Sequence, residues 1–276
     1  MKELPGLQLA DFSSSQFRTR LVIAVVLLNL MVAGLAFQSL HQGLEQSRAR
    51  AAVSTQNIAQ LLEHDIAASF DRIDLTLQAL VDDVQDELSR PRSTRNFDAT
   101  VKHHFSRQPA LGSLVIANSA GTLIAGSAAY KTTPELLADR DYFRRHRDDA
   151  ATGLVISPPL RSRLNGEWII TLSRRYESPP GTFAGAVIAS VRIDHLRQLF
   201  AGIDLGPNGA ISLRELDLAM VTRHPQLSTS EASVGSRSVS AQLRAAIENA
   251  PVAGTYLAST RMDQIERTNT YRRMAR

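Results

Sequence analysis

The longest apolar stretch of the chain, residues 21–40, lies close to its N-terminus. Only Asn29 and a few small residues interrupt it before Gln38. As a helix with a rise of about 1.5 Å per residue, about 20 residues cross the hydrocarbon core of a bilayer, which is about 30 Å thick. The stretch therefore predicts a transmembrane helix over 21–40.

A cleaved signal peptide is the alternative interpretation of this stretch. The stretch is longer than the roughly 7 to 15 apolar residues of a signal peptide, and no clean Ala-x-Ala site ends it, which favours an uncleaved anchor. Lys2, Arg18 and Arg20 lie in the polar segment 1–20 that precedes it. Because positive residues stay on the cytoplasmic side, we expect 1–20 in the cytoplasm and the chain after Leu40 outside.

Residues 41–90 contain no Pro, and their apolar residues recur at steps of three and four from Ile58 to Leu88. This spacing is typical of one face of a helix. A helix of about 50 residues would be about 75 Å long, which is more than one domain needs for packing. We therefore expect a stalk helix over 41–90 that ends before Pro91 and pairs with a second copy of the chain in a homodimer.

After Pro109 the apolar residues form short runs separated by Gly, Pro and Asn turns, which predicts strands. We expect one five-stranded antiparallel sheet with helices on it in a unit over 91–200, and a smaller unit over 201–276 that repeats it. The fold class is therefore α+β. The expected strands are 114–117, 122–125, 154–156, 168–175, 184–192, 210–213, 218–221, 254–259 and 265–272, and the expected helices after the stalk are 97–107, 139–148, 193–200 and 239–249.

Composition narrows the possible functions. The 31 Lys and Arg residues are nearly balanced by 27 Asp and Glu, and no long basic run occurs, so we expect no nucleic-acid partner despite a net charge of +4. The chain has no Cys, which excludes disulfides and thiolate metal sites.

Candidate binding chemistry is concentrated in residues 139–176. Aromatic residues make up only 5% of the chain, yet Tyr142, Phe143, Trp168 and Tyr176 all lie there. An Arg such as Arg140 can hold a carboxylate through two parallel hydrogen bonds, which favours a small anionic or zwitterionic ligand. The residues that we expect to line the site are Arg140, Asp141, Tyr142, Phe143, Arg161, Trp168, Ser173 and Arg175.

Structural roles for the same residues remain open at this point. Arg140 could pair with Asp139 or Asp141 and brace a helix, and Trp168 could be part of the core. Two pairs of Arg residues, Arg161 with Arg163 and Arg174 with Arg175, come from adjacent strands. One Arg of each pair could reach a pocket while the other faces solvent.

No pattern in the chain indicates a metal, a cofactor or a catalytic site. His103-His104 and His64-Asp65 are the only adjacent combinations worth testing, and neighbouring residues on a helix diverge by about 100°. Asp139 and Asp141 diverge in the same way, whereas general acid and base catalysis needs a pair across a cleft. No phosphate loop, nucleophile elbow or His-Glu-x-x-His occurs.

The order of elements and several motifs resemble one family. These motifs are LVIANSAGTLIAGS, DRDYF, LVISPPLRSRLNGEWIITLSRRY, FAGAVIASVRIDHL and LGPNGAISLRELDLAMVTRHP. They are similar to the double Cache sensor region of bacterial membrane receptors, which is often found upstream of diguanylate cyclase or histidine kinase modules. The resemblance implies two PAS-like subdomains along the long helix, a ligand site in the membrane-distal one over 108–192, and a sensor anchored in the inner membrane that faces the periplasm or the cell exterior.

The chain also departs from that family. Amino-acid-binding members carry Arg-x-Trp-Tyr where this chain has Arg140 to Phe143, and Asp217-Leu218 and Asp263-Gln264 stand where members often have Asp-Gly. The family continues with a further strand, a second membrane helix and an output module. The resemblance therefore implies that the second subdomain is incomplete and that the chain is a fragment or a truncated product.

Two other functions are consistent with the same sequence. One is a receptor remnant or structural interaction module that dimerises through 41–90 without any ligand. The other is a membrane-anchored hydrolase, which would require a pair of carboxylates that the sequence does not display.

Overall fold

The structure is a computed structural model that describes residues 14–127, 137–260 and 262–274. The chain divides into two compact units, Met1–Thr55 and Gln56–Arg276. Helix α1 (Ser14–Ser89) begins in the first unit and ends in the second. No break separates 21–40 from 41–90 in the structure, because α1 is continuous through Leu40. It ends two residues before Pro91, whose ring is incompatible with a helix interior.

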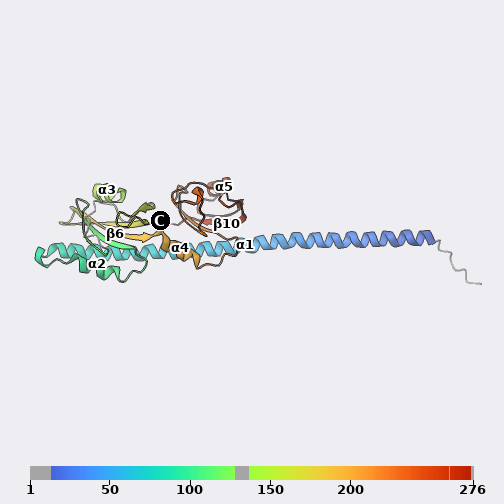
Figure 1. The fold of residues 1–276 in the computed structure, drawn as a ribbon, viewed down its shortest axis with the longest axis horizontal. Helices are drawn as coiled ribbons and strands as arrows, with labels where there is room; N and C mark the ends of the chain where they lie inside the picture. The colour runs from blue at the N-terminus through green and yellow to red at the C-terminus, as the bar shows by residue number, and fades with distance from the viewer. Residues whose placement is uncertain (1–13, 128–136, 261, 275–276) are drawn as a thin grey trace, which may run out of the picture. The chain divides into compact units, whose positions relative to one another are not determined.

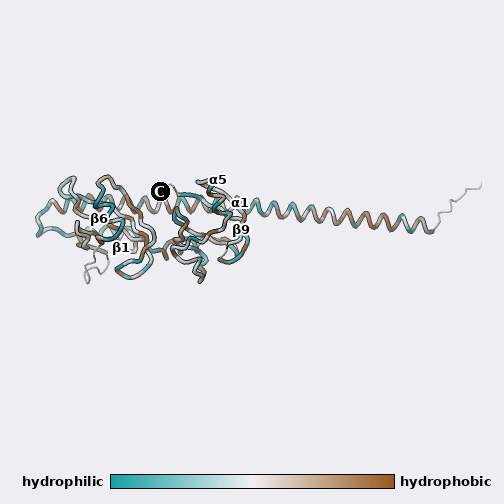
Figure 2. Tube along the Cα trace, turned by 90° about the horizontal axis from the view of Figure 1, so that it is seen from above, coloured by the Kyte–Doolittle hydropathy of each residue, from teal (hydrophilic) through white to brown (hydrophobic). Residues whose placement is uncertain are grey.

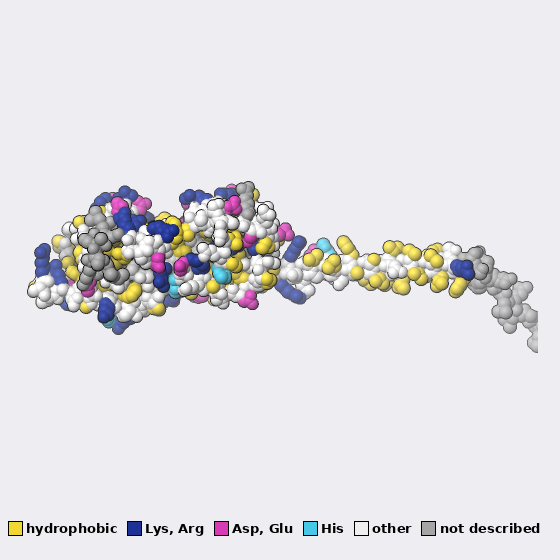
Figure 3. Space-filling view, in the orientation of Figure 1, with side chains coloured by type: hydrophobic (Ala, Val, Ile, Leu, Met, Phe, Trp, Pro, Cys, Tyr) yellow, Lys and Arg dark blue, Asp and Glu magenta, His cyan; other side chains and the backbone are white. Residues whose placement is uncertain are grey.

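In the first unit, every residue of α1 from Leu21 to Leu40 is exposed. The trace of this stretch is largely hydrophobic (Figure 2), and hydrophobic side chains cover the face seen in Figure 3. Within the described residues this helix is long and apolar enough to cross a membrane, with a mean hydropathy of 2.4 in its most apolar part. Asn29 interrupts the apolar surface, but its side chain donates a hydrogen bond of 2.8 Å to the backbone oxygen of Val25. The helix therefore provides a partner for one of the two N–H groups of this amide.

The second unit is built around a six-stranded antiparallel sheet (Figure 1). The strand order is β2-β1-β6-β5-β3, and β4 also pairs with β5. Five strands were expected, and the additional one is β4, which follows Pro158 and Pro159 directly and contains a single apolar residue, Leu160. The strands are β1 (Ser113–Asn118), β2 (Leu123–Gly126), β3 (Val155–Ile156), β4 (Leu160–Arg161), β5 (Trp168–Glu177) and β6 (Phe183–Arg192).

One face of this sheet packs against α1. Ile73, Leu77, Leu80 and Val84 occur at steps of three and four along α1 and are completely or almost completely buried. The short helices η1 (Arg92–Thr94) and α2 (Phe97–Phe105) follow α1, and α2 packs on β1 and β2. The opposite face of the sheet is covered by α3 (Asp141–Asp148), which packs on β5 and β6.

The remaining strands form two separate two-stranded hairpins. After α4 (Ile193–Ala201), strands β7 (Ile211–Arg214) and β8 (Met220–His224) pair with each other. After η3 (Ser230–Ala232) and α5 (Ala241–Asn249), strands β9 (Ala253–Ser259) and β10 (Glu266–Arg272) do the same. In the described residues these pairs do not join into one sheet, so this part does not repeat the first sheet in miniature.

The α+β class is confirmed: a long N-terminal helix is followed by antiparallel sheets.

Candidate functional site

Helix α3 has a buried face and a solvent face. Tyr142, Phe143 and His146 occur at helical spacing and are buried, with no exposed surface at all for His146. The other residues of α3 face outward, and charged Arg and Asp side chains cover this outer side (Figure 3). A histidine therefore lies in the layer between α3 and the sheet, where most side chains are apolar.

Strand β5 supplies the other half of this layer. Successive side chains of a strand point to opposite faces, so Thr171, Ser173 and Arg175 share one face. Ser173 lies on the α3 side, because its hydroxyl oxygen is 3.0 Å from Nε2 of His146. Arg174 lies on the α1 side, where its Nε donates to Oδ1 of Asp74 at 2.5 Å.

A row of hydroxyl groups crosses the α3 side of the sheet. Thr171 on β5 is the register partner of Ser190 on β6, which is the register partner of Ser113 on β1. All three residues are buried. Directly opposed residues in a sheet point to the same face, so three hydroxyl-bearing side chains lie beside one another at this level of the sheet.

Arg175 connects β5 to α3. Its Nη1 donates to the backbone oxygen of His146 at 3.0 Å, and its Nη2 is 2.9 Å from Oε1 of Glu177. The guanidinium also lies over the ring of Phe183, 5.5 Å from its centre, and Phe183 meets Phe143 edge to face. We call His146, Thr171, Ser173 and Arg175 the polar cluster.

His146 is neutral at physiological pH. Burial lowers its pKa from 6.5 to about 4, a hydrogen bond with Ser173 opposes this shift, and the charge of Arg175 adds to it. A neutral imidazole has one donor nitrogen and one acceptor nitrogen. Nε2 faces Ser173, so Nδ1 is the nitrogen that remains for another group.

Four buried side-chain atoms have no hydrogen-bond partner among the described residues. Three belong to the polar cluster: Nδ1 of His146, Oγ1 of Thr171 and Nε of Arg175. The fourth is Nε of Arg140, the residue immediately before α3. Leaving such a group unpaired costs about 1–3 kcal/mol, and a native protein contains few of them. Their concentration around α3 indicates a place where a ligand can supply the missing partners.

The structure separates the residues expected at the site into several groups. Ser173 and Arg175 lie in the polar cluster, and Tyr142 and Phe143 form part of the core under α3. Arg140 donates from Nη2 to the backbone oxygen of Arg161 at 3.0 Å.

Asp139 and Asp141 do not brace Arg140. Asp141 is exposed and pairs with Arg144, whereas Asp139 pairs with Arg163, which lowers the pKa of Asp139 to about 2.

Trp168 is not brought to the polar cluster. The register of β5 is regular from Ile169 to Tyr176, so alternation places Trp168 on the same face as Arg174. The guanidinium of Arg161 lies 4.5 Å from the centre of the Trp168 ring. The two residues therefore form a cation–π pair at the edge of the sheet.

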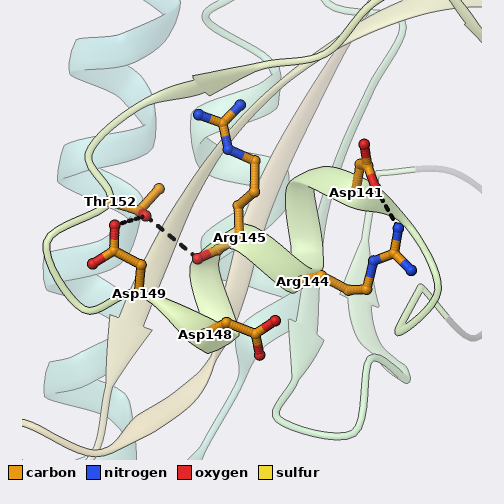
Figure 4. Close-up of a pocket in the computed structure, with 6 residues that line it drawn as sticks. All are labelled: Asp141, Arg144, Arg145, Asp148, Asp149 and Thr152. Carbon is orange, nitrogen blue, oxygen red and sulfur yellow. Dashed lines mark hydrogen bonds and ion pairs between the residues drawn. The ribbon is translucent and has the colours of Figure 1, made fainter.

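Two open hollows lie next to α3, and neither is lined by the polar cluster. One, of about 390 Å³, is lined by Asp141, Arg144, Arg145, Asp148, Asp149 and Thr152 (Figure 4). Its carboxylates have nearby partners: Asp141 pairs with Arg144, Asp148 with Arg147, and Asp149 accepts from Thr152. The other, of about 440 Å³, is lined by Asp74, Arg145, Leu154, Val155, Ile156 and Arg174.

Metal chemistry has no support in the described part of the chain, where no group of three His, Asp or Glu residues has a metal-binding arrangement. Nε2 of His104 lies 2.7 Å from Oδ2 of Asp83. The rings of the adjacent residues His103 and His104 stand at 88° to each other.

Sequence reasoning missed His146 and Thr171. Both follow a periodicity that could have identified them. His146 is three residues after Phe143 and four after Tyr142, which puts it on the apolar face of α3. Thr171 is two and four residues before Ser173 and Arg175, so these polar side chains occupy alternate positions of a strand that is otherwise largely apolar.

No protein-family model matches the chain, and no curated protein matches it. Solved structures do match. The extracellular domain of a protein described as a histidine kinase, rpHK1S-Z16, shares 26% identity with a TM-score of 0.71, over 83% of this chain and 91% of that one.

Two chemoreceptor domains have the same fold at lower identity. The sensory domain of Campylobacter jejuni Tlp3, with isoleucine bound, has 13% identity and a TM-score of 0.57, over 76% of this chain and 85% of that one. The ligand-binding domain of the Pseudomonas aeruginosa amino-acid chemoreceptor PctC, in complex with GABA, has 17% identity and a TM-score of 0.54. This match covers 74% of this chain and 86% of that one.

Proposed function

This chain has the double Cache fold of the extracellular sensory domains of histidine kinases and chemoreceptors, and from that premise we propose that it binds a small anionic or zwitterionic solute between α3 and the large sheet. The observation that carries the proposal is the polar cluster. A sheet face with a hydroxyl row, a buried Arg and a buried neutral His is costly unless these groups are hydrogen-bonded. A bound solute offsets that cost.

The binding residues that we propose are Arg140, Ser173 and Arg175, together with His146 and Thr171. Arg140 and Arg175 supply positive charge near the two ends of α3. Tyr142 and Phe143 support the helix from below as part of the core. Asp141, Arg161 and Trp168 lie outside the polar cluster and would help only by holding the ends of α3 and β5.

The organisation of the whole receptor is part of the same proposal. We propose that 21–40 spans the inner membrane, that 41–90 is the stalk, and that 91–200 and 201–276 are membrane-distal and membrane-proximal PAS-like subdomains in the periplasm. Ligand binding would transmit a signal only by favouring one of two arrangements of paired α1 helices.

Thermal melting of the full chain in detergent tests the binding proposal. A ligand that binds the folded state raises the melting temperature by mass action. We expect a rise with at least one member of a panel of small carboxylic and amino acids, and we expect Arg175→Gln to remove that rise. Arg147→Gln is the matched control, because Arg147 lies on α3 but is exposed and pairs with the exposed Asp148. A rise that survives in Arg175→Gln would place the binding site elsewhere.

A further inference from the structure

We infer that the ligand of the site under α3 is a small organic carboxylate that carries no ammonium group. This inference rests on the proposed function and goes beyond it by excluding amino acids. It starts from the four buried atoms without a partner: Nε of Arg140, Nε of Arg175, Oγ1 of Thr171 and Nδ1 of His146. The two Arg nitrogens can only donate, and the Thr171 hydroxyl can donate. Nδ1 of His146 is an acceptor when Nε2 donates to Ser173, whose hydroxyl in turn donates to the backbone oxygen of Val155.

The two Arg nitrogens therefore require acceptors, and an acceptor also suits the Thr171 hydroxyl. A carboxylate offers two oxygens with about four lone-pair positions and no donor. An ammonium group offers only donors. Thr171 and His146 can accept as well as donate, but neither carries a negative charge, so an ammonium group placed beside them would be buried without a counter-ion.

The carboxylates near α3 are already paired. Glu177 accepts from Arg175 and from the backbone nitrogen of Gly181. Asp139 pairs with Arg163, and Asp141 pairs with Arg144. Among the described residues, no other Asp or Glu lies on β5, β6 or the buried face of α3. Within the part of the chain that the structure describes, an amino acid at this site would gain a negative partner for its ammonium group by breaking one of these pairs.

The positive charges of Arg140 and Arg175 also disfavour a ligand that carries an ammonium group. Arg175 contacts the backbone of His146, and its side chain is only 10% exposed. Its charge already disfavours a second positive charge on that imidazole. A ligand ammonium at the same position would be subject to the same repulsion. Arg140 and Arg175 therefore favour a ligand with net negative charge, whereas a zwitterion gains from one end and loses from the other.

Two of the solved structures with this fold contain isoleucine and GABA. In this chain the buried atoms without a partner include two Arg nitrogens, which can only donate. The distinction can be measured because each amino acid has a counterpart that differs only in the amino group.

The experiment is isothermal titration calorimetry of the full chain in detergent with matched pairs. The pairs are succinate and aspartate, 4-methylpentanoate and leucine, and butanoate and GABA. We expect at least one acid without the amino group to bind at least about tenfold more tightly than its partner. Thr171→Val should weaken that acid severalfold, and Arg147→Gln, on the solvent face of α3, should leave the preference unchanged.

The outcomes separate the inference from the proposed function. If an amino acid binds as tightly as its counterpart or more tightly, and Arg175→Gln abolishes this binding, the inference is wrong and the proposed site stands. If no member of the panel binds, or if binding is the same in Arg175→Gln, both are overturned. Preference for the acid that is lost in Arg175→Gln supports both.

Discussion

Thr171 and Ser173 lie two residues apart on the same face of β5, yet only the Ser173 hydroxyl has a partner, Nε2 of His146. Replacing Thr171 by Val keeps the shape and removes the unpaired hydroxyl. We expect the free energy of unfolding of the ligand-free chain to rise by about 1 kcal/mol while ligand affinity falls.

Denaturant unfolding, monitored by circular dichroism, measures this change in stability. Thr100→Val is the control, because the Thr100 hydroxyl donates to Glu87 and to the Asn96 backbone oxygen, so its loss should destabilise the chain. A destabilised Thr171→Val would mean that the Thr171 hydroxyl already has a partner.

His146 makes stability depend on pH. Its pKa is about 4 in the folded chain and 6.5 when unperturbed, so between these values the unfolded chain binds one proton more than the folded chain. The free energy of unfolding should therefore fall as pH decreases from about 6.5 to about 4, by an amount on the order of 2–3 kcal/mol.

Above pH 6.5 His146 adds no pH dependence, because the imidazole is neutral in both states. Urea unfolding at a series of pH values measures the effect. His146→Gln should remove this part of the slope, and His103→Gln, at an exposed position on α2, should leave it intact. An unchanged slope in His146→Gln would show that His146 is accessible to protons in the folded chain.

At the level of elements, periodicity alone was sufficient to predict most of the fold. The expected strand 184–192 corresponds to β6 (Phe183–Arg192), and the expected helix 139–148 corresponds to α3 (Asp141–Asp148). The spacing of apolar residues and the turn residues that bound an element are local features of the sequence, and both are clear in these two segments. Two features depend on contacts between distant segments, which a local pattern does not contain. One is the two-residue strand β4, and the other is that β7 pairs with β8 and with no other described strand.

The site was harder to predict than the elements. Alternation shows that Trp168 and Ser173 lie on opposite faces of β5, but it does not show which face α1 covers. The face that α1 covers is evident only from contacts such as the ion pair between Asp74 and Arg174, two residues 100 positions apart. Arg175 and Ser173 were therefore identified as candidates together with Trp168, and only the structure separates them.

The Asp74–Arg174 pair should make a measurable contribution to stability. Asp74 is buried and accepts at Oδ1 and Oδ2 from Arg174. Removing one member of a buried pair leaves the other charge unpaired, which costs about 3–5 kcal/mol, whereas replacing both by apolar residues is often nearly neutral. We expect Arg174→Met alone to destabilise the chain strongly and Asp74→Leu with Arg174→Met to recover much of the loss.

A double-mutant cycle measured by denaturant unfolding tests this coupling. The exposed pair Asp194–Arg197 on α4 is the control, and a cycle on it should give less than about 1 kcal/mol. Additive effects at Asp74 and Arg174 would show that the pair does not hold α1 to the sheet.

At the scale of the whole molecule, association is expected to involve α1. Leu61 and Leu75 are 59% and 64% exposed and lie two heptads apart, which is the spacing of a helix–helix seam. We expect a weak dimer that Leu61→Glu with Leu75→Glu converts to a monomer. Sedimentation in detergent measures the change. Leu199→Glu, at an exposed position on α4, is the control, and a dimer that persists in the Leu61/Leu75 double variant would place the interface elsewhere.

Membrane topology can be tested with unusual precision because the chain contains no Cys. A single Cys introduced at any position is then the only thiol that a maleimide can label. Lys2, Arg18 and Arg20 flank the apolar stretch on one side, and the positive-inside rule places that side in the cytoplasm. Gln242→Cys, at an exposed position on α5, should therefore react with a maleimide that does not cross the inner membrane, in intact cells.

Gln8→Cys should react with the same reagent only after the cells are lysed. The reverse pattern would contradict the proposed orientation. The signal-peptide alternative gives a third pattern, because cleavage after the apolar stretch would remove residue 8 and the anchor together. Gln242→Cys would then be labelled on a soluble chain, and Gln8→Cys would give no labelled full-length product before or after lysis. Retention of both labels on one membrane-bound chain is expected, since the apolar stretch is long enough to span the bilayer.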